Sequence, residues 1–110
     1  MFGIFKKRPV DDEKVKNFVK WFVANNEVII GSLNNDAMEY LNAVEYQLSL
    51  VYRDGFQGNI EFQYGHNDIT GKYELYLFHL NNIFLKEATA KIKEELEPQI
   101  GEKWTFFVEK

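Results

Sequence analysis

The sequence predicts an α+β two-layer sandwich in which helices pack on one face of a three-stranded antiparallel sheet. Segments 59–64 and 73–78 alternate apolar and polar residues as strands do, and three other segments space their apolar residues by three and four, as helices do. An aromatic run at 104–108 predicts a third strand, so the order is α-α-β-β-α-β. A helix separates the last two strands, which lets the chain cross over and place the last strand beside the first, in sheet order 2-1-3.

The first helix is predicted over about 12–33. Pro9 ends the segment before it, and the acids at 11–13 supply an N-cap and favourable charges for the first turn. The helical spacing continues past Asn25 and Asn26, where a bend is expected. The β-branched run 28–30 leaves a short strand as the alternative for those residues. The apolar positions of this helix are Val15, Phe18, Val19, Phe22, Ile29 and Leu33.

A second helix is predicted to follow a cap at 34–36 and to end before Gly55. The short connection makes the first two helices an antiparallel pair. Its apolar positions are Met38, Leu41, Val44, Leu48 and Val51.

The third helix is predicted over about 83–96, capped by Asn81-Asn82 and ended by Pro98 and Gly101. Glu87 and Lys91 form an i,i+4 pair on its exposed side. Its buried positions are Leu85, Ala88, Ile92 and Leu96.

The first two strands are predicted to form a hairpin around the loop 65–72. The alternation suggests a register that pairs Ile60 with Leu77, Phe62 with Leu75 and Tyr64 with Tyr73, all on the face that packs on the helices. The opposite face is polar but unusually aromatic. It carries Glu61, Gln63, Glu74, Tyr76 and Phe78, and Phe107 of the last strand is expected to join them.

With 110 residues, the chain is expected to form one domain over 11–110, preceded by an N-terminal tail at 1–10. Of its residues 45% are hydrophobic and 16% aromatic, as in a folded globule, and a chain of this size buries roughly 65% of its unfolded surface. The absence of cysteine excludes thiol catalysis, thiolate zinc sites and disulfides, and it fits a cytoplasmic location.

The net charge of -4 argues against nucleic acid as a partner, because affinity for nucleic acid depends on neutralising phosphates. The N-terminal tail joins apolar residues to the basic cluster Lys6-Lys7-Arg8, which leaves a weak membrane-surface contact as an alternative to a frayed or packed terminus. No run approaches the roughly 20 apolar residues that span a bilayer, so no stable membrane association is expected.

Catalytic and metal-binding patterns are sparse, and we expect neither an enzyme nor a cofactor. His66 and Asp68 have a spacing that suits two metal ligands, but a site usually needs three or four. In the predicted register Glu61 lies diagonal to Glu74, about 7–8 Å away, a separation that also occurs between the two carboxylates of an acid/base pair. An open sheet face, however, does not desolvate either carboxylate, as catalysis would require. Solvated acids are the expectation there.

The order of elements and several short segments resemble a group of small, uncharacterised bacterial proteins. A helix carrying Trp21-Phe22 and then Asn26-Glu27 precedes a strand that ends at Tyr64-Gly65. A strand of the form Lys-x-Glu-Leu at 72–75 is followed by a helix and a strand that begins at Trp104. At 78–82 the chain has Phe-His-Leu-Asn-Asn, where a small Ser-Ala-Asp-Gly-like segment is expected. The resemblance implies the fold and no activity.

Two functions follow from these patterns. The first is a non-enzymatic protein-binding domain with Tyr76, Phe78 and Phe107 as anchors in a rim of Glu61, Gln63 and Glu74. Its partner is a second copy of the chain or another protein, and one form would be an immunity-type inhibitor of a basic partner. The alternative is a small-ligand pocket between helices and sheet, lined near Trp21, His79 and Trp104.

Overall fold

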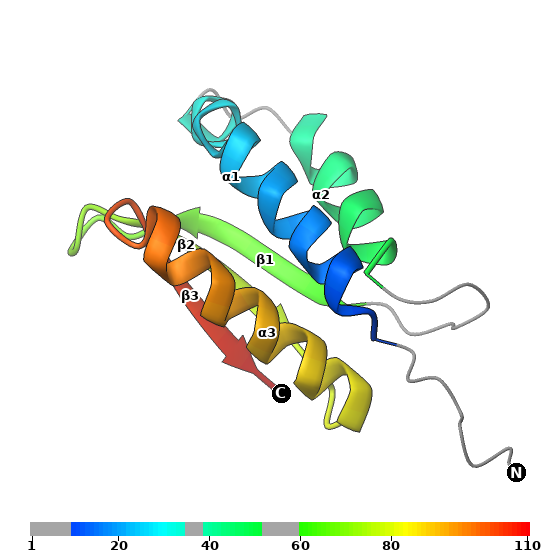
Figure 1. The fold of residues 1–110 in the computed structure, drawn as a ribbon. Coiled ribbons are helices and arrows are strands. Elements are labelled where there is room, and N and C mark those ends of the chain that lie inside the picture. The colour runs from blue at the N-terminus through cyan, green and yellow to red at the C-terminus, as the bar shows by residue number, and fades with distance from the viewer. Residues whose placement is uncertain (1–9, 35–38, 52–59) are drawn as a thin grey trace, which may run out of the picture.

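The computed structural model describes residues 10–34, 39–51 and 60–110. The elements follow the predicted order (Figure 1). They are helix α1 (Asp12–Asn34), helix α2 (Glu39–Ser49), strand β1 (Glu61–His66), strand β2 (Tyr73–Phe78), helix α3 (Ile83–Ile100) and strand β3 (Trp104–Glu109). The predicted α+β class is confirmed, with three helices and one three-stranded sheet in the part of the chain that the structure describes.

The helical spacing of apolar residues located the helices well. Asp11 caps α1, its Oδ1 accepting hydrogen bonds from the backbone N–H groups of Glu13 at 2.9 Å and Lys14 at 3.4 Å. The β-branched run 28–30 is helical, so the alternative of a short strand there is wrong. The predicted buried positions of α3 are all buried, and the pair Glu87–Lys91 forms at 3.4 Å. Met38 and Gly55, which the prediction of the second helix used, lie outside the described residues.

Helix α3 runs further than predicted. It continues through Pro98 to Ile100, so the prediction that Pro98 ends the helix is wrong. A proline lacks one backbone donor, and in the last turn this loss is small because the following N–H groups still pair. The backbone N–H of Gly101 donates to the carbonyl of Glu97 at 3.0 Å and closes the helix.

The sheet has the order β1-β2-β3, so the predicted order 2-1-3 is wrong. β1 and β2 are antiparallel, whereas β2 and β3 are parallel, which makes the sheet mixed rather than antiparallel. Helix α3 returns the chain to the end of the sheet where β2 begins, so β3 must run in the same direction as β2. The strand with two neighbours is β2, whose inward side chains, Leu75 and Leu77, are 0% exposed. The inward residues of β1, Phe62 and Tyr64, are only half-buried, as suits an edge strand.

The hairpin register differs from the prediction by two residues. Phe62 pairs with Leu77 and Tyr64 with Leu75, because Gly65 and His66 belong to β1 rather than to the loop. The loop is held by Asn67, whose backbone N–H donates to the carbonyl of Lys72 at 2.8 Å and whose Oδ1 accepts from Ile69 and Thr70. A shift of two keeps every side chain on its predicted face, since strand side chains alternate with a period of two.

The described helices all lie on one side of the sheet (Figure 1). Helix α1 packs against α3 and also against α2. Its Phe22 ring meets Trp104 of β3 edge-on at 5.1 Å and Phe106 at 6.4 Å, so α1 and α3 share the inward face of the sheet. A buried hydrogen bond from Trp104 Nε1 to Asn26 Oδ1, 3.3 Å long, fixes α1 on this core. No helix in the part of the chain that the structure describes lies over the outward face of the three strands.

Candidate interaction face

The open face is defined here as the outward-pointing residues of the three strands. The pairings arrange them in three cross-strand rows. The rows are Gly65–Glu74–Thr105, then Gln63–Tyr76–Phe107, then Glu61–Phe78–Glu109. The structure therefore brings the six predicted face residues together on one surface. Thr105 was not predicted as part of it, although its position next to Trp104 in an alternating strand already gave it the outward parity.

Three aromatic rings form the centre of the open face. Tyr76 stacks on Phe107 across the parallel strand pair, with ring centroids 4.6 Å apart and an angle of 12° between the planes. Phe78, two residues further along β2, lies 6.4 Å from Tyr76, again with an angle of 12°. All three are partly exposed. They form an apolar plate that water reaches on one side.

The acidic residues of the sheet surround this plate. The three strands contain three glutamates, Glu61, Glu74 and Glu109, and no lysine or arginine. By alternation all three glutamates point to the open face. The lysine nearest the start of β3, Lys103, forms an ion pair with Glu27 of α1, and Lys72 donates its Nζ hydrogen bond to the carbonyl of Gly101 at 3.0 Å.

Glu74 is held in place by two donors. The side-chain amide of Asn67 donates to Oε2 at 2.9 Å and the Tyr76 hydroxyl donates to Oε1 at 3.0 Å. The hydrogen bond to Glu74 raises the pKa of Tyr76, with further contributions from desolvation and from the charges of Glu74 and Glu109. The phenol therefore stays a neutral donor, and the carboxylate that accepts from it is oriented.

The predicted diagonal pair of Glu61 and Glu74 does not form. In the observed register the two carboxylates belong to the first and third rows of the open face, four residues apart along the strands. That offset is about 13 Å at the rise of a β-strand, too far for an acid/base pair on one bond. The register shift of two residues leaves each side chain on its predicted face, but it moves Glu61 and Glu74 apart along the strands.

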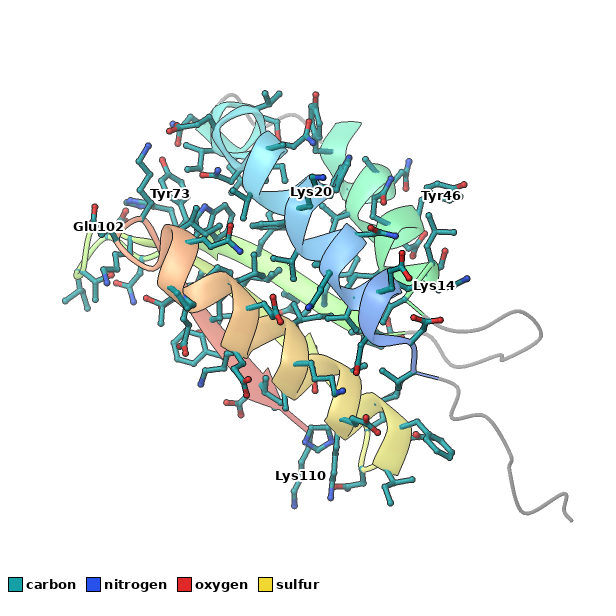
Figure 2. The ribbon with its side chains drawn as sticks, viewed as in Figure 1. Lys14, Lys20, Tyr46, Tyr73, Glu102 and Lys110 are labelled. Atoms are coloured by element: carbon teal, nitrogen blue, oxygen red, sulfur yellow. The ribbon has the colours of Figure 1, made fainter. Side chains whose placement is uncertain are left out.

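The three residues of the alternative pocket do not meet. Trp104 begins β3, pairs with Tyr73 and is 1% exposed, whereas the backbone N–H of His79 donates to the carbonyl of Glu109 at the far end of β3. Glu109 follows Trp104 by five positions in β3, a distance of about 16 Å along the strand. Figure 2 shows Tyr73 at one end of the sheet and Lys110 at the other. Trp21 belongs to α1, where its ring lies beside those of Phe18 and Phe22.

The histidines have structural partners. His66 Nδ1 lies 2.8 Å from Asp68 Oδ1, and its ring packs on Tyr73 at 4.7 Å. Among the described residues no group of three or more His, Cys, Asp or Glu side chains is placed to hold a metal ion. His79 Nδ1 accepts a hydrogen bond from the backbone N–H of Asn81 at 3.0 Å, so this histidine shapes the turn between β2 and α3.

No protein-family model, curated protein or solved structure matches this chain. The resemblance to small bacterial proteins therefore stays a prediction. None of the described helices is long and apolar enough to cross a membrane.

Proposed function

We propose that this chain is a non-enzymatic binding domain whose open face receives a cationic segment of another protein. The observation that carries the proposal is the composition of that face, in which a plate of three stacked aromatic rings is bordered by three glutamates. Aromatic anchors surrounded by polar residues are where interfaces concentrate their binding energy. Lysine and arginine side chains can interact favourably with both groups, through cation–π contacts with the rings and through electrostatic attraction to the carboxylates.

The same charges favour a foreign partner over a second copy. Two open faces brought together would place six carboxylates in one interface, and the strands provide no lysine or arginine to neutralise them. Buried carboxylates without a partner are strongly unfavourable. An inhibitor of a basic protein, such as an immunity-type protein, is one biological form that this chemistry supports.

The test is an NMR titration of the ¹⁵N-labelled full chain with two synthetic peptides of about a dozen residues. One peptide is rich in lysine and arginine with a single leucine at one end, and the other carries glutamate in place of every basic residue. The expected result is a set of amide shifts centred on β2 and β3 with the basic peptide alone. Added salt should weaken this binding, because the surface charges are screened.

Two variants locate the binding. Phe107→Ala removes the ring that stacks on Tyr76 and should weaken binding about 5- to 30-fold, the effect of losing 1–2 kcal/mol. Tyr46→Ala removes an aromatic side chain that is 61% exposed on α2, in the helical layer (Figure 2), and should leave binding unchanged. Equal shifts with both peptides, shifts away from the sheet, or no shifts at all would overturn the proposal.

A further inference from the structure

The N-terminal tail has the chemistry that the open face is suited to bind. Residues 1–9 lie outside the part of the chain that the structure describes. Their sequence places three large apolar side chains, Phe2, Ile4 and Phe5, directly before the basic cluster Lys6-Lys7-Arg8. The open face presents the matching groups, an apolar plate of rings bordered by glutamates. The two are therefore complementary in both polarity and charge.

The acids nearest the expected path of the tail have no cation of their own. Glu61 and Glu109 border the third row of the open face, and both are exposed. Among the described residues no lysine or arginine forms an ion pair with either of them. A cationic segment that reaches this row would supply the missing charge.

Helix α1 fixes the place where the tail joins the folded body. Asn26 of α1 accepts from Trp104, at the end of the sheet where β3 begins, and Phe22 contacts both Trp104 and Phe106. Followed backwards from Asn26, α1 therefore runs along β3 towards its last residue. The distance back to Asp12 is about 21 Å at the rise of an α-helix, whereas β3 spans about 16 Å. Helix α1 thus begins at the third-row end of the sheet, where β1 also begins (Figure 1).

The tail is long enough to reach the open face from this point. Val10 is 5% exposed and belongs to the core between helices and sheet, so the tail must pass the end of the sheet, a path of about 10 Å. An extended chain spans at most about 3.6 Å per residue, which gives Lys6 a reach of about 14 Å and Phe2 about 29 Å. Successive rows of the face are only about 7 Å apart. The basic cluster can therefore lie over the third row while the apolar residues lie over the rings.

We propose that segment 2–8 is an intramolecular ligand of the open face. Its basic cluster binds beside Glu61 and Glu109, and its apolar side chains pack on the rings of Phe78 and Phe107. This inference rests on the proposed function of the open face, since it makes the tail a competitor of the foreign partner. A tethered ligand acts at an effective concentration in the millimolar range, so individually weak contacts are sufficient. The partner binds by displacing the tail, which lowers its apparent affinity.

The test compares two full-length variants of equal net charge. One replaces the basic cluster of the tail, as Lys6→Gln, Lys7→Gln and Arg8→Gln. The control replaces three surface lysines of α1 and α3, as Lys16→Gln, Lys20→Gln and Lys93→Gln. Each loses three positive charges, so the general attraction to the basic peptide increases equally in both. The tail variant should nevertheless bind that peptide about 5- to 10-fold more tightly than the control, because the tail of the control leaves only about one face in five to ten free.

A synthetic peptide with the sequence of residues 1–9 measures the same contact between separate molecules. Added to the tail variant at millimolar concentration, it should shift the amide signals of β2 and β3. The same peptide with glutamine in place of its three basic residues should not, because it lacks the charges that the glutamates attract.

Three outcomes would overturn the tail as an intramolecular ligand. They are equal affinity of the two variants for the basic peptide, no shifts in β2 and β3 with the tail peptide, and a wild-type dimer that the tail variant dissociates. The last would place the tail on a second copy. The effect of Phe107→Ala on binding of the basic peptide is measured independently of all three, so a failure here is distinct from a failure of the proposed function.

Discussion

Tyr76 shows how one side chain on the open face is controlled by its neighbours. Its ring stacks on Phe107 and lies near Phe78, while its hydroxyl donates to Glu74. The alternation of the sequence was enough to predict the face of these residues. The hydrogen bond could not be predicted, since alternation places Glu74 and Tyr76 on one face without saying how their side chains turn. In the structure Asn67 also donates to the Glu74 carboxylate.

The first prediction concerns the ionisation of Tyr76. Because the hydrogen bond to Glu74 is the main cause of its raised pKa, Glu74→Ala should bring that pKa back towards the ordinary value of 10.0. A difference titration of phenolate absorbance between wild type and variant isolates this group from the other tyrosines. The Tyr76→Phe variant is the control, since it should lack the displaced step altogether. Superimposable titrations of wild type and Glu74→Ala would refute the hydrogen bond.

The sign of the effect on stability follows from the same shift. A pKa raised in the folded state means that the contribution of protonated Tyr76 is fully present below the unfolded value of 10.0. It is lost as the pH rises through the folded pKa. At neutral pH the wild type should therefore have a higher free energy of unfolding than Tyr76→Phe. This difference should disappear as the pH rises above 10.

At the scale of elements, β2 is the centre of the sheet and β1 is an edge. This order explains the burial of Leu75 and Leu77, which are enclosed by strands on both sides and by helices above. We predict that Leu75→Ala lowers the free energy of unfolding by about 2–5 kcal/mol, the cost of a cavity in a closed core. Ile69→Ala, in the hairpin loop, should change it by less than about 0.5 kcal/mol. Urea denaturation measures both, and a loss below about 1 kcal/mol for Leu75→Ala would contradict a central β2.

The elements themselves were predictable because their signals are local. Asp11 and Asn82 mark helix starts, and alternation marks the strands, whatever the rest of the chain does. The order of the strands is a tertiary property. β3 could pair with either outer edge of the hairpin, that of β1 or that of β2. It pairs with β2 because the aliphatic Leu75 and Leu77 are better suited to a central, fully buried strand than the amphipathic Tyr64 of β1. The two-residue register error came from counting Gly65 and His66 as loop, where His66 in fact packs on Tyr73.

Across the whole molecule, the charges are distributed unevenly between the two layers. Lys91 and Lys93 of α3 pair with acids of the helical layer, and Lys103, in the turn before β3, pairs with Glu27 of α1. The strands contribute only glutamates, and all of these point outward. An acidic aromatic surface on one side of a small domain attracts basic partners and repels its own copies.

This repulsion leads to the last prediction. The wild type should be a monomer at tens of micromolar, and the triple variant Glu61→Gln, Glu74→Gln, Glu109→Gln should self-associate at least tenfold more tightly, because it keeps the aromatic plate and removes its charges. The matched control, Glu94→Gln, Glu95→Gln, Glu97→Gln, changes the net charge equally but on α3, and it should stay monomeric. Sedimentation equilibrium distinguishes the three proteins. A wild-type dimer that Phe107→Ala dissociates would show instead that the open face pairs with a second copy, and the charge argument for a foreign partner would then be wrong.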